Sequence, residues 1–289
     1  MGAAFVPAPR TAGKAKTMIT REIPSTGEAI PVVGMGTWQT FDVATARERQ
    51  ALQPVLQAFF DAGGTVIDSS PMYGRAEETV GELLPAMNGG ERAFVATKVW
   101  TRGRDAGLRE MKRSIRRMGG RLDLVQVHNL LDYTTHIQTL RRWKEEGTIR
   151  YLGVTHYQLD AFDDLERIIE RDGVDFVQLP YSIGMREAEK RLLPAARKRG
   201  TAVLVMRPFE EGRVFERVKG KALPSFASEI DCDSWAQFFL KFILGHPAVT
   251  CPIPATANVR HMQDNMRAGL GRLPDEAMRR RMLDAYSAL

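Results

Sequence analysis

The chain has 289 residues, of which 44% are hydrophobic and 26% are charged, as expected for one folded domain. No apolar run approaches the ~20 residues that a membrane-spanning helix needs, and we therefore expect no membrane protein. Lys and Arg outnumber Asp and Glu by 41 to 35, and this excess favours anionic small molecules. Because the basic residues are spread over several helical faces, they do not indicate nucleic-acid binding.

The beginning of the chain and its cysteines bear on the compartment. Residues 1–20 are predicted to be a disordered leader, because the segment up to about Lys16 is rich in Ala and Pro and has no apolar period. The leader lacks the apolar segment of a secretion signal, so we expect a cytoplasmic protein. A periplasmic location is the alternative if a signal segment was removed before residue 1. Cys232 and Cys251 have neither metal-ligand nor redox spacing and are expected to be buried free thiols.

A small β-hairpin is predicted at the start of the folded part. Strand-forming residues around Ile23 and at 30–33 flank the turn sequence Ser25-Thr26-Gly27-Glu28. Residues 21–289 are then expected to form a single domain, and we expect a monomer.

After the hairpin, short strand-forming runs alternate with helical patterns. Eight strands are predicted, at residues 32–37, 65–68, 94–98, 124–128, 151–155, 176–179, 202–206 and 249–253. The intervening helices are predicted at 47–61, 77–87, 107–118, 136–146, 159–170, 188–199, 234–244 and 259–268, and a last amphipathic segment covers 275–286. This alternation predicts an α/β protein with a parallel sheet. We expect the sheet to close into a (β/α)8 TIM barrel, although an open doubly wound sheet would show the same pattern.

Polar residues end three consecutive predicted strands. Asp68, Lys98 and His128 each follow an apolar run, in which a charge would be costly to bury. In a parallel barrel such strand ends form one polar mouth at the C-terminal face. Tyr73 lies five residues after Asp68, in a loop that reaches the same mouth.

These four residues together can activate a tyrosine. The Lys98 ammonium would lower the pKa of the Tyr73 phenol, and Asp68 would hold Lys98 in its protonated form. Tyr73 would then be a usable acid near neutral pH. Any one of the four taken alone has an ordinary structural explanation, and it is their conjunction that indicates catalysis.

From Ile23 to Leu289 the sequence resembles the aldo-keto reductase superfamily. The resemblance rests on Gly34-Met35-Gly36-Thr37-Trp38, on Asp68-Ser69-Ser70-Pro71-Met72-Tyr73-Gly74, on Thr97-Lys98-Val99-Trp100 and on Gln126-Val127-His128-Asn129. Weaker matches are Gly153-Val154-Thr155-His156, Gln178 and Ile253-Pro254-Ala255-Thr256 with Asn265. The family's catalytic tetrad of Asp, Tyr, Lys and His falls on Asp68, Tyr73, Lys98 and His128 without substitution.

The resemblance implies a barrel whose bottom is plugged by the N-terminal hairpin, and an NADPH-dependent reductase acting on a small aldehyde or ketone. A hydride would pass from the nicotinamide to the carbonyl carbon, and Tyr73 would supply the proton while His128 binds the carbonyl oxygen. Trp38 and Trp100 would line the substrate pocket, or else be core residues at strand ends. No metal is expected.

The resemblance also implies a set of cofactor contacts, some of them altered. Thr37 and Gln178 match the family, whereas Thr155 and His156 stand where the family often has Ser and Asn. The expected contacts are Thr37, Thr155, His156, Gln178, Met206, Arg207, Phe209, Thr256, Arg260, His261 and Asn265. Arg260 is expected to bind the 2′-phosphate, which makes NADPH and NADP⁺ the expected cofactor pair and NADH the weaker ligand.

Two other functions remain open from the sequence. A non-catalytic or very slow NADP(H)-binding subunit of the same fold could sense redox state, although the intact tetrad argues against it. An unrelated barrel hydrolase or lyase could use the same Asp, Lys and His, although the chain has no convincing metal cluster and Tyr73 is in register.

Overall fold

The structure is a computed structural model that describes residues 17–289, so residues 1–16 of the predicted leader lie outside the described residues. The chain is already tied to the domain at Ile19, whose amide N–H donates to the Gly269 carbonyl at 2.9 Å. The folded part therefore includes residues before the predicted boundary at residue 21.

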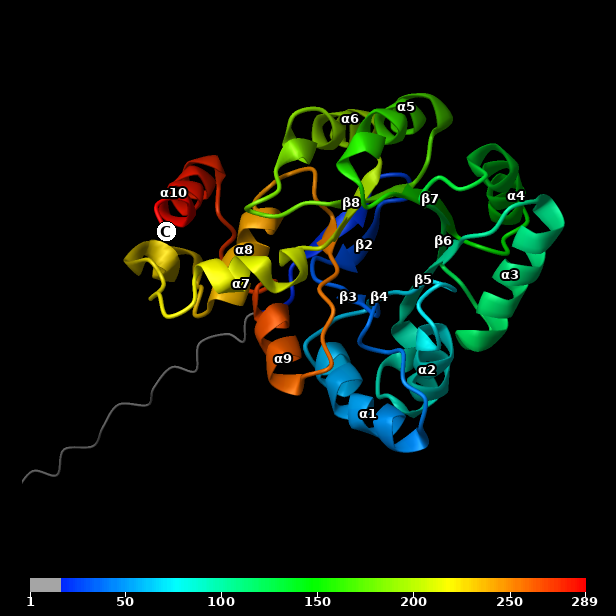
Figure 1. The fold of residues 1–289 in the computed structure, drawn as a ribbon, viewed down its shortest axis with the longest axis horizontal. Helices are drawn as coiled ribbons and strands as arrows, with labels where there is room; N and C mark the ends of the chain where they lie inside the picture. Colours follow the sequence, from blue (N-terminus) through cyan, green and yellow to red (C-terminus); the bar gives the residue numbers. More distant parts are fainter. Residues whose placement is uncertain (1–16) are drawn as a thin grey trace, which may run out of the picture.

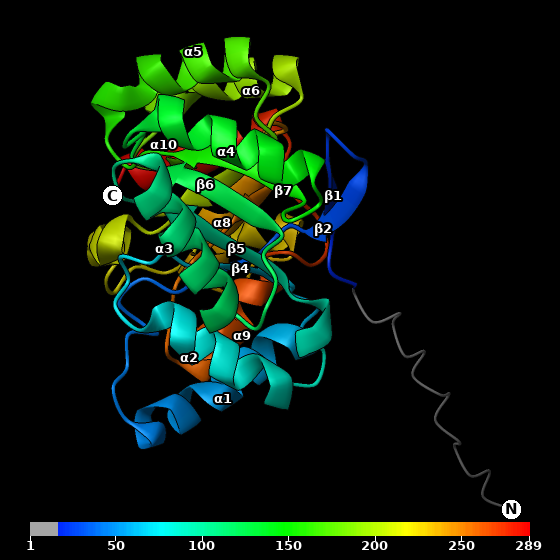
Figure 2. The ribbon, with the colours of Figure 1, turned by 90° about the vertical axis from the view of Figure 1, so that its right-hand side faces the viewer.

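The predicted hairpin is confirmed. Strand β1 (Thr20–Ile23) pairs antiparallel with β2 (Glu28–Pro31), and Gly27 turns the chain between them with a positive φ of 75°. Figure 2 shows the hairpin at one end of the barrel. Ile23 and Ile30 belong to the same buried cluster as Phe176 and other barrel-interior residues, so the hairpin closes that end.

Eight parallel strands form the barrel, as Figure 1 shows. They are β3 (Met35–Gly36), β4 (Val66–Asp68), β5 (Phe94–Val99), β6 (Leu124–His128), β7 (Tyr151–Thr155), β8 (Phe176–Pro180), β9 (Ala202–Met206) and β10 (Cys251–Pro252). Neighbours along the chain are neighbours in the sheet, from β3 to β10. A parallel bridge between Gly36 of β3 and Ala255, just after β10, closes the sheet, which confirms the (β/α)8 barrel and excludes the open sheet.

Helices surround the strands (Figure 1). They are α1 (Ala46–Asp61), α2 (Ala76–Leu83), α3 (Arg104–Arg117), α4 (Tyr133–Glu145), α5 (Phe162–Asp172), α6 (Leu192–Arg199), α7 (Arg213–Arg217), α8 (Trp235–Leu244), α9 (Val259–Arg267) and α10 (Glu276–Ser287). Short 3₁₀ helices occur at η1 (Leu84–Ala86), η2 (Gly90–Arg92), η3 (Leu159–Ala161), η4 (Glu187–Glu189), η5 (Glu210–Gly212) and η6 (Ser225–Ile230). Apolar helix faces and outward strand residues such as Val95, Val127 and Val203 make up the main core.

The structure differs from the predicted elements at the barrel seam and in one connection. Strands β3 and β10 are shorter than predicted, because Pro252 and Pro254 have no N–H to donate to a neighbouring strand. The connection from β9 to α8 contains α7, η5 and η6, none of which was predicted. These segments are short, and a helix of one or two turns leaves too little periodicity to detect.

Strand alternation explains how polar side chains enter the barrel. Val66, Phe94, Leu124 and Phe176 face the interior and pack together near the hairpin. Successive strand residues face opposite sides, so residues two or four positions further along the same strands also face inward. This places Asp68, Lys98, Gln126, His128 and Gln178 inside the barrel, on the side away from the hairpin.

Candidate active site

A buried ion pair joins β4 to β5. The Lys98 ammonium lies 2.6 Å from Asp68 Oδ2, with Lys98 fully buried and Asp68 only 2% exposed. Burial alone would lower the pKa of Lys98, but the charges of Asp68 and Tyr73 and hydrogen bonds to both raise it above its ordinary value. Lys98 is therefore a fixed positive charge inside the barrel.

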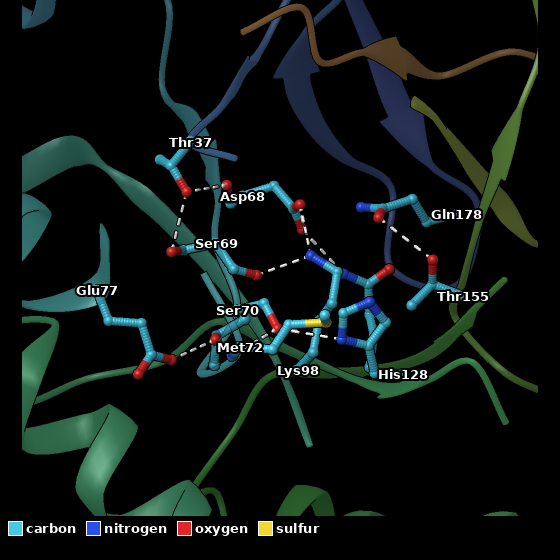
Figure 3. A network of polar contacts seen from close by, with 12 residues as sticks. Thr37, Asp68, Ser69, Ser70, Met72, Glu77, Lys98, His128, Thr155 and Gln178 are labelled. Carbon is cyan, nitrogen blue, oxygen red and sulfur yellow. Dashed lines mark hydrogen bonds and ion pairs between the residues drawn. The ribbon is translucent and has the colours of Figure 1, made fainter. Parts of the chain in front are cut away.

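Two further contacts hold this pair in one geometry. Lys98 Nζ also donates to the Ser69 carbonyl oxygen at 2.7 Å (Figure 3). The Gln126 amide donates to Asp68 Oδ1 at 3.0 Å. Thr37 Oγ1 lies 3.1 Å from the Asp68 carbonyl oxygen and 3.0 Å from Ser69 Oγ, so it ties the end of β4 to the loop after β3. Each carboxylate oxygen of Asp68 thus has its own donor, which disfavours rotation of the side chain.

The loop after β4 carries Tyr73 over this pair. The Tyr73 amide N–H donates to the Ser70 carbonyl at 3.0 Å, and Gly74 follows in a left-handed conformation. A Cβ at Gly74 would also lie 2.3 Å from the Asp42 carboxylate, so the chain needs glycine there. Lys98 Nζ lies 5.1 Å from the centre of the Tyr73 ring, which brings the predicted Asp, Tyr and Lys together.

The pKa of Tyr73 differs from the sequence-based expectation. Burial raises the pKa of the phenol, and the positive charge of Lys98 opposes this rise without reversing it. Desolvation of the phenol, which depends on the folded surroundings, outweighs the effect of the lysine. At neutral pH Tyr73 therefore keeps its proton, which is the state that a proton donor needs.

His128 completes the cluster from the end of β6. Its ring centre lies 6.1 Å from that of Tyr73 and 6.2 Å from that of Trp100. Burial, together with the charges of Lys98 and His156, lowers the pKa of His128 to about 2, so the ring is neutral. Ser70 Oγ lies 3.1 Å from its Nδ1.

Several exposed apolar side chains lie near the predicted site residues in the chain. Trp38 and Trp100 are 38% and 41% exposed, so the alternative that they are core residues is wrong. Met72 and Tyr157 are also exposed, beside Tyr73 and His156 in the chain, and the sequence did not single them out. Single exposed apolar residues are common in loops, and only their position in the structure distinguishes these two.

The ends of β7 and β8 carry another predicted group. Thr155 Oγ1 donates to Gln178 Oε1 at 3.2 Å, and both residues are buried. Within the described residues, Gln178 Nε2 is buried and has no hydrogen-bond partner. His156 is half-buried and accepts the Gln158 amide N–H on Nδ1 at 3.2 Å. An unpaired buried amide is costly, and its donor suits a ligand that offers a carbonyl oxygen, as a carboxamide does.

The predicted residues after β9 lie in a loop with unusual backbone. Arg207 has a positive φ of 52°, and its guanidinium lies over the Tyr157 ring and 3.3 Å from Glu211. Met206 is partly exposed, whereas Phe209 packs on Phe215 with ring centres 4.9 Å apart. Phe209 thus contributes to packing inside this connection.

The predicted residues after β10 surround the start of α9. Thr256 and Asn265 are buried, whereas Arg260 and His261 are exposed on the first turn. The Asn258 side chain caps this turn by accepting the Arg260 and His261 amide N–H groups. The Arg260 and His261 side chains are thus available at a capped helix start.

Other features of the described residues bear on the remaining expectations. Between residues 17 and 289 there is no group of three or more His, Cys, Asp or Glu that could hold a metal ion. No helix in this range is long and apolar enough to cross a membrane. Cys232 and Cys251 are buried and free, as predicted.

Comparison with known proteins identifies the relatives of this chain. The model of the Aldo/keto reductase family matches residues 32–282. Methylglyoxal reductase YeaE of Escherichia coli (strain K12) is 27% identical over 245 residues, which are 82% of this chain and 84% of the relative. The aryl-alcohol dehydrogenase [NADP(+)] of Phanerodontia chrysosporium is 23% identical over 80% of this chain and 74% of its own length.

Solved structures show the same fold. An aldo-keto reductase from Klebsiella pneumoniae in complex with NADPH is 25% identical and superposes with a TM-score of 0.76. The match covers 94% of this chain and 95% of that one. The fold agreement thus extends over nearly the whole of both chains.

Proposed function

The chain belongs to the aldo/keto reductase family of NAD(P)H-dependent oxidoreductases, and on this premise we propose that it reduces an aldehyde or ketone with NADPH, using Tyr73 as the proton donor. The observation that carries the proposal is the buried Lys98–Asp68 pair beneath Tyr73, with His128 beside it. A buried ion pair is not needed to stabilise a barrel and often contributes little to stability. Its place under a phenol supports a catalytic role.

The residues present fit a nicotinamide cofactor. Gln178 Nε2 lacks a partner and suits the carboxamide oxygen, with Thr155 fixing the Gln178 side chain. His156, Met206 and Arg207 would contact the nicotinamide and the phosphates, and Thr37 and Phe209 would support their loops. Thr256, Arg260, His261 and Asn265 would hold the adenosine part and its 2′-phosphate. When bound, the cofactor supplies the hydride for the carbonyl carbon.

The chain's own residues supply the rest of the chemistry. Tyr73 donates a hydrogen bond to the carbonyl oxygen, and neutral His128 donates a second one. As negative charge grows on that oxygen, Tyr73 releases its proton. Lys98 stabilises the phenolate that remains, because its pKa is held high by Asp68.

The substrate is proposed to be a small carbonyl compound bound between the exposed aromatic side chains Trp38 and Trp100. Two relatives are named for quite different compounds, methylglyoxal and aryl alcohols. Family membership therefore does not fix the substrate.

Two assays on the wild-type protein test the proposal. NADPH oxidation is followed at steady state with a panel of aldehydes, ketones and quinones, and cofactor binding is followed by quenching of protein fluorescence. Binding together with turnover supports the reductase. NADPH binding without turnover of any compound would contradict the reductase and favour the redox-sensing subunit. Absence of NADPH binding would overturn the proposal.

A further inference from the structure

The tautomer of His128 decides whether this residue can act as a donor. At neutral pH its imidazole is neutral and carries one hydrogen, on either Nδ1 or Nε2. A nitrogen that carries the hydrogen can donate to a carbonyl oxygen, whereas a bare nitrogen would direct a lone pair at it. The neighbour that contacts one ring nitrogen therefore determines what the other can do.

That neighbour is Ser70. It is fully buried, and its Oγ lies 3.1 Å from His128 Nδ1. The Met72 amide N–H donates to the same oxygen at 3.4 Å. Figure 3 shows the contact between Ser70 and His128 as a dashed line.

The number of hydrogens available determines which of the two groups, the Ser70 hydroxyl or His128 Nδ1, is the donor. Ser70 Oγ has a single hydrogen, and among the described residues Nδ1 is the acceptor that it contacts. If Nδ1 carried the hydrogen instead and donated to Oγ, the buried hydroxyl hydrogen would have no acceptor. Leaving a buried donor unpaired is unfavourable, so the hydroxyl donates and Nδ1 accepts.

We propose that Ser70 is a positioning residue for the active site: its hydroxyl donates to Nδ1 of His128, which places the ring hydrogen on Nε2, where it can donate to the substrate oxygen. This inference rests on the proposed function, because it assigns the role of His128 in that reaction. Ser70 itself touches neither substrate nor cofactor in this account.

The direct test is the tautomer of His128 in the intact protein. The chain has five histidines, and the His128 signals in a ¹⁵N-histidine-labelled sample are those lost in His128→Gln. We expect a hydrogen bonded to Nε2 and none on Nδ1 in the wild-type protein. A hydrogen on Nδ1 would overturn the proposal, and this measurement needs neither a variant at Ser70 nor an identified substrate.

Variants at Ser70 and Ser69 test whether the Ser70 hydroxyl sets the His128 tautomer or only fills space in the core. Ser70→Ala removes the hydroxyl, and we expect a second His128 signal from the Nδ1–H form, together with a kcat about threefold to tenfold lower at unchanged cofactor affinity. Ser70→Thr keeps a hydroxyl and should restore the single tautomer. Ser69→Ala is the matched control, because the Ser69 hydroxyl is equally buried but contacts Thr37, and it should leave the His128 tautomer unchanged.

The outcomes distinguish this inference from the proposed function. A wild-type protein with the Nε2–H form but no carbonyl reduction would contradict the proposed function and leave the Ser70 contact established. A Ser70→Ala protein with an unchanged single tautomer and unchanged kcat would overturn the inference while the reductase stands.

Discussion

The Lys98 ammonium and the Asp68 carboxylate meet at 2.6 Å inside the barrel, where neither side chain has appreciable contact with solvent. The sequence predicted a polar mouth at these strand ends, and the structure shows that the ion pair within it is buried. Two opposite charges buried together depend on one another, because either alone would be an uncompensated charge in the interior. Catalysis and stability are therefore coupled at this pair.

Replacing Lys98 with Met should consequently do more than stop turnover. It leaves Asp68 buried without a counter-charge, and we expect a loss of about 3–5 kcal/mol in the free energy of unfolding. In the double variant Asp68→Leu/Lys98→Met, which removes both charges, much of that loss should be recovered while reduction stays abolished. Denaturant unfolding of the three proteins measures this. A Lys98→Met protein as stable as the wild type would show that the pair is not effectively buried.

Gln178 and Gln126 offer a matched pair of substitutions in the barrel interior. Gln178 Nε2 has no partner among the described residues, whereas Gln126 Nε2 donates to Asp68. We expect Gln178→Leu to weaken NADPH binding by roughly tenfold, which corresponds to about one hydrogen bond. Gln126→Leu should instead lower kcat at nearly unchanged NADPH affinity. Equal effects of both substitutions on cofactor titrations would contradict the assignment of Gln178 to the carboxamide.

Arg260 is the residue expected to distinguish NADPH from NADH. It is exposed on the capped first turn of α9, where its guanidinium can form two hydrogen bonds with a phosphate. One such contact is worth roughly 1.5–3 kcal/mol, so we predict about tenfold or greater preference for NADPH. Arg260→Ala should remove most of this preference and leave NADH affinity nearly unchanged. Titration of both cofactors against both proteins measures the difference in affinity between NADPH and NADH. If this difference persists in Arg260→Ala, the 2′-phosphate is bound by His261 or Arg207 instead.

The neutral state of His128 predicts an acid-sensitive contribution to stability. Because burial lowers its folded-state pKa to about 2, the unfolded chain binds a proton on this residue below its ordinary pKa of 6.5 and the folded chain does not. Stability from this residue is present above pH 6.5 and is lost as the pH falls, by about 1.4 kcal/mol per pH unit. The difference in unfolding free energy between wild type and His128→Gln should shrink at that rate from pH 6.5 to 4.5. A constant difference over this range would mean that His128 ionises in the folded protein.

Much of the fold could be predicted from sequence because strands and helices alternate with distinct periods. The strands at 124–128, 151–155 and 202–206 have the predicted bounds, and the positions of Asp68, Lys98 and His128 at strand ends followed from the same pattern. The pKa of Tyr73 was not predictable, because desolvation depends on what covers a residue. Gln126 could have been found, since it lies two residues before His128 on the same strand face. Ser70 could not, because its contact joins the loop after β4 to the end of β6, which is distant in sequence.

The central claim, that Tyr73 donates the proton in a carbonyl reduction, is tested most directly by the turnover of Tyr73→Phe. This change removes one hydroxyl and keeps the ring beside Lys98 and His128, so the barrel and the cofactor site should be unaffected. With the most reactive aldehyde of the panel, kcat should fall by about 10²-fold or more, while NADPH affinity measured by fluorescence titration should hardly change. Turnover retained at the wild-type rate in Tyr73→Phe would contradict the account.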